Sequence, residues 1–385
     1  MKHVYLDHNS TTPLLPEVLD TMIPLMADTW GNASSTHRYG IEARYVVERS
    51  RRTIESLIGA PDDSLVITSG GSEANNLAIR GVALEARQLG LGNHLLVGAA
   101  EHKAVLDTAM DLQARFGFQV TYLRPDAFGR ARPGAVARAL RGDTVLVALM
   151  LANNELGTIN QVADIAQLVL ERAPTARVHC DAVQAAGRIH VDVGRLRVDT
   201  LALSAHKMYG PKGVGGLYIR PGVQVARQIA GGGQERSLRA GTESPALAAG
   251  FARAFELAED LRDGEAERLS RLREELWKML SQLGPQIVRN SPAEGCLPGT
   301  LNVSLLGLDG RSVARELDAE GFAISAGSAC TSEGEEVSHV MEAIGADPER
   351  ARGAVRVSLG RQTTREEIEA FARAFRARVR MLASA

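Results

Sequence analysis

The chain contains 385 residues, which predicts two domains, or one large domain with an appendage. Hydrophobic residues make up 45% and charged residues 23% of the sequence, and the formal net charge at pH 7 is −2. This composition is typical of a globular protein and excludes disordered, collagen-like and coiled-coil chains. Because nucleic-acid binding requires a basic face, the near-neutral charge argues against a nucleic acid as the main partner.

Membrane, secretion and metal signals are missing from the sequence. No run approaches the roughly 18 consecutive apolar residues of a membrane span, and the first residues, MKHVYLDHNS, lack the apolar core of a signal peptide. We therefore expect a cytoplasmic protein that does not bind membranes. Cys180, Cys296 and Cys330 are widely separated and odd in number, which fits neither a disulfide framework nor a CxxC metal site. No bound metal is expected.

Apolar runs alternate with helical patterns through the first two thirds of the chain. The predicted strands are residues 64–68, 94–98, 119–123, 144–150, 177–180 and 200–203. Nearly continuous apolar runs are typical of strands buried on both faces, so we expect a mainly parallel sheet covered by helices. In such α/β sheets, ligands bind beyond the carboxyl ends of the strands.

The pattern changes after Gly241. Leucine and phenylalanine recur at helical spacing over residues 247–280, which predicts a long connecting helix. Strand-like runs follow at 301–306 and 354–359, and Thr363-Thr364 with two glutamates three residues later predicts a capping box that begins a closing helix. These elements predict a second, smaller α+β unit.

The turn after the first predicted strand, residues 64–68, has the features of a phosphate site. Ser69-Gly70-Gly71-Ser72-Glu73 lies between the strand at 64–68 and a helical pattern. Backbone N–H groups and the helix dipole favour a phosphate there, and Ser72 adds a hydroxyl. A plain strand-to-helix turn remains an equal alternative, because neither dinucleotide nor Walker A spacing is present.

Asp181 and Lys207 each directly follow an apolar strand. A lysine that forms an imine with a cofactor aldehyde, and a carboxylate that keeps a pyridine nitrogen protonated, are the pair that pyridoxal-phosphate chemistry requires. The alternative is a structural ion pair. Lysine occurs only at positions 2, 103, 207, 212 and 278, and Lys103 and Lys212 are the rivals for this role. Lys207 is favoured because Ser204 and His206 beside it can donate to a phosphate.

Further polar residues also follow predicted strands. His102 is placed to stack on a cofactor ring and to move protons, since its ordinary pKa lies near neutral pH, although a structural histidine is the commoner outcome. Asn154, Glu155 and Gln184 occupy similar positions and carry less information individually.

Cys330 and Arg356 are the unusual residues of the last third. Cys330 lies in the small-residue run SAGSACTSEG, where a nucleophile explains a cysteine better than packing does, whereas Cys180 and Cys296 are expected to be buried. Arg356, in AVRVSLG, suits a substrate carboxylate, and a surface arginine on a half-exposed strand is the alternative.

Ten segments in order resemble the NifS/IscS-like cysteine desulfurases, which are fold-type I pyridoxal-phosphate enzymes. They are YLDHNSTTP, GNASSTHRYG, TSGGSEANNLAIRG, AEHKAV, MLANNELGTIN, DAVQAAG, LSAHKMYGPKGVGGLYIR, GGGQERSLRAGTES, SAGSACTS and VRVSLGRQTT. The resemblance covers nearly the whole chain. It implies an α/β fold in which residues 16–249 form a large cofactor-binding domain with a mainly parallel seven-stranded sheet. Residues 1–15 and 250–385 would form a small α+β domain that carries Cys330.

The resemblance also implies a role for each matching residue. Lys207 would form the Schiff base with pyridoxal 5′-phosphate, Asp181 would pair with the ring nitrogen and Gln184 would bind the ring oxygen. His102 would stack on the ring. The implied phosphate ligands are Gly71, Ser72, Ser204 and His206, with Thr242 supplied by the second subunit of a homodimer. The implied substrate ligands are Arg356, Asn32 and Asn154, the last of which also contacts the cofactor.

The activity that the resemblance implies is conversion of L-cysteine to L-alanine, with Lys207, His102 and Cys330 as catalytic residues. The sulfur would pass as a persulfide on Cys330 to an acceptor protein, for iron–sulfur cluster, thio-cofactor or tRNA biosynthesis. Another fold-type I enzyme, such as a selenocysteine lyase or an aminotransferase, and a non-catalytic sulfur-binding protein are the alternatives. Cys330 separates the first group from a desulfurase, and cofactor binding separates the second.

Overall fold

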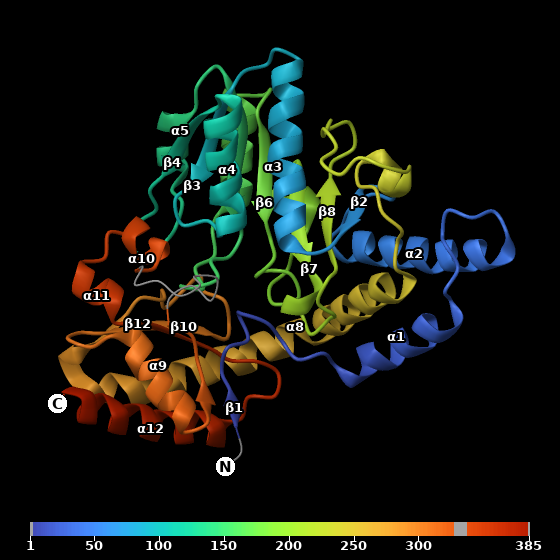
Figure 1. Ribbon diagram of the computed structural model, residues 1–385. Helices are drawn as coiled ribbons and strands as arrows, with labels where there is room; N and C mark the ends of the chain where they lie inside the picture. Colours follow the sequence, from blue (N-terminus) through green and yellow to red (C-terminus); the bar gives the residue numbers. More distant parts are fainter. Residues whose placement is uncertain (1–2, 327–336, 384–385) are drawn as a thin grey trace.

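A computed structural model describes residues 3–326 and 337–383, so that Cys330 lies outside the described residues. Figure 1 shows a central sheet with helices on both faces, above a smaller unit that contains both chain ends. None of the helices within the two described ranges is long and apolar enough to cross a membrane.

The central sheet has seven strands in the order β2-β8-β7-β6-β5-β3-β4. Their bounds are β2 Leu65–Thr68, β3 His94–Gly98, β4 Gln119–Leu123, β5 Thr144–Met150, β6 Arg177–Asp181, β7 Thr200–Ser204 and β8 Gly215–Ile219. β8 is antiparallel to both of its neighbours, and the pairings from β7 through β4 are parallel. The predicted α/β class and mainly parallel sheet are confirmed.

β8 is the sheet strand that the sequence analysis did not predict. Its sequence, GGLYI, begins with two glycines and has only two side chains, Tyr218 and Ile219, that favour strands. A Cβ on Gly215 would lie 2.5 Å from the carbonyl oxygen of Leu203 and 2.7 Å from the Cα of Gly70. The glycine therefore permits the close packing of β8 beside the turn that begins α3, and only the assembled sheet shows this.

Two apolar layers cover the sheet. Side chains of α3 and α4 form the core on one face, and side chains of α1, α2, α6 and α8 contribute to the core on the other. The helices before α8 are α1 Pro16–Asp28, α2 Arg38–Leu57, α3 Gly71–Gln88, α4 Lys103–Phe116, α5 Pro133–Ala139, α6 Val162–Arg172 and α7 Val193–Leu196, with 3-10 turns η1 Ala205–Lys207 and η2 Gln234–Ser237. Most of the apolar runs predicted to be buried on both faces are thus covered on both. The prediction is wrong for β4, which lies at the edge of the sheet and buries only Leu123.

A single helix, α8 (Pro245–Leu280), connects the sheet to the smaller unit. Phe251 and Phe255, near its start, pack in the core of the central sheet, whereas Leu272 and Leu276 pack in a separate core. The predicted long connecting helix is confirmed. The predicted domain boundary at residue 249 stays a prediction.

The smaller unit contains a three-stranded antiparallel sheet in the order β12-β10-β9, and β1 pairs with β11 in parallel beside it. Its elements are β1 Val4–Tyr5, η3 Ser281–Gln286, β9 Ile287–Arg289, β10 Thr300–Leu305, α9 Gly310–Ala319, β11 Phe322–Ala323, α10 His339–Ala343, α11 Pro348–Arg352, β12 Ala354–Ser358 and α12 Arg365–Ala383. The capping box is present, since Thr364 N donates to Glu367 Oε2 and Glu367 N donates to Thr364 Oγ1.

Candidate active site

A cavity of about 230 Å³ lies at the carboxyl ends of the parallel strands, where ligands bind in open α/β sheets. The predicted site residues that line it are Gly71, Ser72, His102, Asn154, Asp181, Gln184, Ser204, His206, Lys207 and Arg356. Asn32 and Thr242 are exposed and do not line this cavity. The structure thus brings together predicted site residues from six separate segments of the chain.

Asp181 ends β6 with its carboxylate held at both oxygens. Asn75 Nδ2 donates to Oδ2 at 2.7 Å, and the backbone N–H of Val183 donates to Oδ1 at 3.0 Å. The side chain is buried. A carboxylate with bonds to neutral donors at both oxygens is fixed in direction and keeps capacity for one more donor.

Lys207 follows β7 on the short turn η1. Its Nζ donates to the carbonyl oxygens of Asn9, at 2.7 Å, and Ser10, at 2.6 Å. The N-terminal segment therefore forms one wall of the cavity and holds the amine there. The sequence analysis quoted this segment only as part of a resemblance, because no spacing rule joins residues so far apart in the chain.

Both polar atoms of the Gln184 side-chain amide form hydrogen bonds. Its Nε2 donates to Asn9 O at 2.8 Å, and its Oε1 accepts from Arg188 Nη1 at 2.9 Å. Arg188 also donates to the backbone oxygen of His8, and burial lowers its pKa to about 10. Arg188 was not predicted, and it fixes the amide so that the N–H side of Gln184 faces the N-terminal segment.

The first turn of α3 has the properties of an anion site. Gly70 occupies the N-cap without a side-chain cap, and a Cβ on Gly71 would lie 2.6 Å from Val183 Cγ2. Ser204 Oγ is buried beside this turn with no hydrogen-bond partner among the described residues. A helix N-terminus and an unused hydroxyl together fit a phosphate group.

His206 lies beside the same cavity. Burial, reinforced by the positive charges of Lys207 and Lys212, lowers its pKa to about 4, so the ring is neutral at pH 7. Its Nδ1 lies 3.1 Å from Thr11 Oγ1. When Nδ1 accepts from this hydroxyl, Nε2 carries the ring hydrogen and is a donor.

His102 is the N-cap residue of α4. Its Nδ1 accepts from the backbone N–H of Ala104 at 3.0 Å, which leaves the ring hydrogen of the neutral form on Nε2. The ring is partly exposed in the cavity wall. His102 therefore both caps α4 and forms part of the cavity wall.

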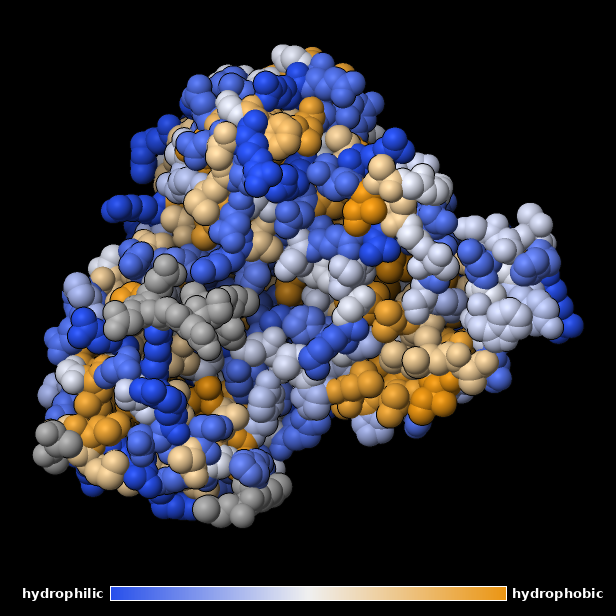
Figure 2. Space-filling view, viewed as in Figure 1, coloured by the Kyte–Doolittle hydropathy of each residue, from blue (hydrophilic) through white to orange (hydrophobic). Residues whose placement is uncertain are grey.

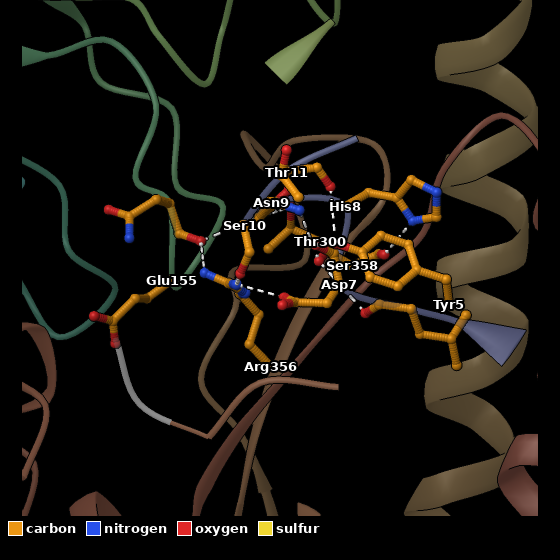
Figure 3. A network of polar contacts seen from close by, with 12 residues as sticks. Tyr5, Asp7, His8, Asn9, Ser10, Thr11, Glu155, Thr300, Arg356 and Ser358 are labelled. Carbon is orange, nitrogen blue, oxygen red and sulfur yellow. Dashed lines mark hydrogen bonds and ion pairs between the residues drawn. The ribbon is translucent and has the colours of Figure 1, made fainter. Parts of the chain in front are cut away.

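Arg356 projects from β12 into the cavity and is 2% exposed, so it is not an arginine on a half-exposed surface strand. Its Nη2 donates to Asp7 Oδ1 at 2.6 Å and to Ser10 Oγ at 2.7 Å, and its Nη1 donates to Asn154 O at 2.9 Å (Figure 3). Its Nε has no partner among the described residues, and neither has Asn154 Oδ1. Asp7 is a site residue that the sequence analysis missed.

Residues on both sides of 327–336 contact the cavity wall. Before this segment, Ser325 and Arg356 exchange two backbone hydrogen bonds, at 3.1 and 2.7 Å. After it, Ser338 Oγ donates to Glu155 Oε2 at 2.5 Å, and Glu155 directly follows Asn154. His339 Nε2 also donates to the backbone oxygen of the residue that precedes His102, at 2.8 Å.

The two described cysteines lie in packed surroundings. Cys180 is fully buried and Cys296 is partly buried, and burial raises the pKa of both thiols. Cys296 Sγ donates to the backbone oxygens of Leu156 and Thr300. Neither thiol is activated as a nucleophile. Within the described ranges, no group of three His, Cys, Asp or Glu side chains is placed to hold a metal ion.

A model of the class-V aminotransferases matches residues 4–371, nearly the whole chain. The chain belongs to the aminotransferase class-V family. Membership in this family implies pyridoxal phosphate as the cofactor. The family resemblance inferred from the sequence is confirmed.

Similar class-V family proteins include the cysteine desulfurase IscS of Dictyoglomus turgidum. It is 42% identical over 367 residues, which cover 95% of this chain and 92% of that protein. The cysteine desulfurase IscS of Anaeromyxobacter dehalogenans is also 42% identical, over 98% of this chain and 93% of its own.

Solved structures agree with this assignment. A NifS-like protein superposes with a TM-score of 0.92 at 35% identity, with full coverage of both chains. SspA, in complex with cysteine, superposes with a TM-score of 0.81 at 35% identity and covers 92% of this chain and 98% of its own. DndA from Streptomyces lividans has a TM-score of 0.77 at 36% identity, with 92% and 99% covered.

Proposed function

We propose that this protein is a cysteine desulfurase that converts L-cysteine to L-alanine and passes the sulfur, as a persulfide on Cys330, to an acceptor protein. The observation that carries the proposal is the single cavity that Lys207, Asp181, His102 and Arg356 share. The cysteine desulfurases at 42% identity over at least 95% of the chain support it, as does the similar fold of SspA in complex with cysteine.

The cavity residues fit pyridoxal 5′-phosphate. The bound cofactor supplies an aldehyde for imine formation and a ring that accepts electrons. Lys207 is the proposed attachment point, Asp181 the partner of the ring nitrogen, Gln184 that of the ring oxygen and His102 the stacking residue. The proposed phosphate ligands are Gly71, Ser72, Ser204 and His206, together with Thr242 of a second subunit. The Ser204 hydroxyl, which has no hydrogen-bond partner within residues 3–326 and 337–383, and the first turn of α3, which has no side-chain cap there, support this orientation.

The remaining residues bind and process the substrate. Arg356 binds the carboxylate of L-cysteine, and Asn154 and Asn32 are the proposed additional ligands. The amine of Lys207, held at the N-terminal segment before substrate binds, removes the α-proton. His102 Nε2 exchanges protons with the thiols. These roles use groups of suitable type at one cavity, with the exception of Asn32, which is placed outside it in this chain.

Cys330 is the proposed sulfur acceptor. Its sulfur, as a thiolate, forms a bond with the substrate sulfur, while the bond from that sulfur to the substrate β-carbon breaks and its electron pair remains with the carbon. The β-carbon takes up the proton that the Cys330 thiol gave up, the α-carbon regains its proton from Lys207, and the product is released as alanine. Cys180 and Cys296 do not compete, because burial raises the pKa of both thiols. The contacts of Ser325, Ser338 and His339 hold the chain on both sides of 327–336 at the cavity.

The direct test supplies L-cysteine to the purified protein with pyridoxal phosphate. We expect alanine to form in proportion to the sulfide released under reducing conditions. Without a reductant, mass spectrometry of peptides should place one added sulfur atom on Cys330. Formation of pyruvate instead of alanine, or no reaction with cysteine, contradicts the proposed activity.

Arg356→Lys is expected to raise the KM for cysteine by about tenfold to a hundredfold. The lysine keeps a charge that can pair with Asp7, but the bidentate guanidinium donor for the substrate carboxylate is lost. Steady-state kinetics of the holoenzyme measure this change. Arg350→Lys is the matched control, since Arg350 contacts Asn290 outside the cavity. An unchanged KM in Arg356→Lys shows that this guanidinium does not bind the substrate.

A homodimer is the proposed assembly. Figure 2 shows hydrophobic side chains gathered over the region of α1. The exposed apolar residues there are Leu19, Ile23, Met26 and Trp30, and Trp30 stacks on exposed Tyr39 at a centroid distance of 4.8 Å. A contiguous apolar face of this kind is typical of an interface between subunits.

Ile23→Asp combined with Met26→Asp is expected to convert the dimer to a monomer, because two charges would have to be buried in an apolar contact. Sedimentation equilibrium measures the mass. Leu89→Asp, at an exposed leucine after α3, is the matched control and should remain dimeric. A double variant that keeps the dimer mass would place the interface elsewhere.

A further inference from the structure

Behind Asp181, a continuous chain of hydrogen bonds joins three side chains to its carboxylate. Thr200 Oγ1 on β7 lies 2.9 Å from His179 Nδ1, and His179 Nε2 on β6 lies 2.9 Å from Asn75 Oδ1. Asn75 Nδ2, on α3, donates to Asp181 Oδ2 at 2.7 Å. Asn75 is 1% exposed, and His179 and Thr200 are 0% exposed. The proposed reaction does not use any of these three side chains.

We call Thr200, His179 and Asn75 the array. The chemistry of their side chains fixes the direction of every hydrogen bond in it. An ionised carboxylate only accepts, so Asn75 must present its NH₂ group to Asp181 and its oxygen to His179. The oxygen only accepts, so His179 carries its hydrogen on Nε2. The Nδ1 atom of the neutral ring then accepts from the Thr200 hydroxyl. Each hydrogen therefore points toward Asp181, and each bond polarises the next one.

The titratable groups around the array are consistent with this direction. Burial lowers the pKa of His179 to about 3, so the ring is neutral at pH 7. Burial, together with the charge of Asp181, raises the pKa of Cys180, on the same strand, and of Glu101, after β3, well above their ordinary values. Both shifts favour the uncharged forms of these two acids beside the carboxylate on which the array ends.

We propose that Asn75, His179 and Thr200 are positioning residues that hold the carboxylate of Asp181 in a fixed direction as the acceptor for the ring nitrogen of the bound cofactor. The inference rests on the proposed function, because it requires pyridoxal phosphate with its ring nitrogen at Asp181. Without His179, the Asn75 oxygen loses its donor and the amide is no longer held from behind, and without Asn75 the carboxylate loses a bond on one oxygen. The contribution of the array is thus specific to the nitrogen atom of the cofactor ring.

A matched control for this array exists on another strand of the same sheet. His94 on β3 is also fully buried, with Nδ1 2.8 Å from Thr144 Oγ1 and Nε2 2.9 Å from Thr121 Oγ1. It begins its strand, so it lies at the end of the sheet remote from Asp181. Substitution of His94 therefore removes a buried histidine–threonine pair without altering the array.

The experiment compares the affinity of the apoprotein for two ligands: pyridoxal phosphate and the analogue in which carbon replaces the ring nitrogen. Equilibrium dialysis measures both, without any turnover. The wild type is expected to prefer pyridoxal phosphate by about tenfold or more, as one charge-assisted hydrogen bond allows. His179→Leu and Asn75→Leu should lose most of this preference, whereas His94→Leu should keep it.

Two milder variants cover the case in which the leucine variants do not fold. Thr200→Val removes the first donor at nearly constant volume and should reduce the preference by about twofold to fivefold. His179→Gln retains an N–H that can donate to Asn75 and should preserve more of the preference than His179→Leu does. In the unliganded wild type, nitrogen NMR should show the neutral Nε2–H form of His179 from pH 5 to pH 8.

Each outcome is decisive. Equal affinity of the wild type for the two ligands would show that Asp181 does not contact the ring nitrogen, and the cofactor assignment in the proposed function would then fail. A preference that Thr200→Val and the leucine variants retain overturns the positioning role alone. Loss of the preference in His94→Leu, or the Nδ1–H form of His179 in the NMR spectrum, overturns it as well.

Discussion

Cys330→Ala is expected to reduce sulfide release from cysteine by more than about 10³-fold, which is the scale on which loss of a covalent nucleophile is felt. The reason is that neither of the other two cysteines offers a substitute, since burial raises the pKa of both Cys180 and Cys296. Sulfide and alanine assays on the reduced holoenzyme measure the effect. The absorption band of the bound cofactor should remain, because the proposed cofactor ligands are unchanged.

Cys296→Ala is the matched control for this variant. Its Sγ contacts two backbone oxygens outside the proposed cofactor site, so its loss should leave sulfide release within about twofold of the wild type. Desulfuration that persists in Cys330→Ala would remove this residue from the mechanism. It would then favour a lyase or an aminotransferase reaction at the same cavity.

Lys207→Ala is expected to abolish both turnover and covalent cofactor attachment. The Lys207 amine is held at the cavity by the backbone oxygens of Asn9 and Ser10. The same cavity includes the turn before α3, which is the proposed phosphate site. After treatment with borohydride, the wild type should retain the cofactor through denaturation, and the variant should release it. The activity loss should exceed about 10³-fold.

Lys212→Ala and Lys103→Ala are the controls, because these two lysines were the rivals in the sequence. Neither lines the cavity. Both variants should keep the reducible attachment. Borohydride trapping on either lysine in the wild type would displace Lys207 from its proposed role.

The sequence predicted the features that depend on local pattern. Apolar runs gave six strands of the central sheet, periodicity gave α8, and the Thr364–Glu367 capping box began α12 as expected. The rule that ligands lie at the carboxyl ends of parallel strands also placed Asp181 and Lys207 together. These features are set by contacts within a segment or by the general geometry of sheets.

The features that sequence analysis missed depend on contacts between distant segments. Asp7 pairs with Arg356 across 349 positions, and Arg188 joins Gln184 to the N-terminal segment. In the sequence, His179 is one polar residue within a predicted apolar strand and was not singled out. Its partner Asn75 lies 104 positions earlier, so no local pattern connects the two. No periodicity links such pairs, so only the folded chain shows which buried polar groups meet.

The helix α8 contributes residues to two hydrophobic cores but does not line the cofactor cavity. Arg356, the proposed carboxylate ligand, belongs to a strand of one unit, and Lys207 and Asp181, the proposed cofactor ligands, belong to the other. The distance between the two proposed sites is therefore set by how the units are joined. Because α8 packs in the cores of both units, it ties their relative orientation to its own length. Each helical residue turns by about 100°, so deleting a few residues from α8 would rotate one unit against the other. The substrate would then be misaligned although every proposed ligand is still present.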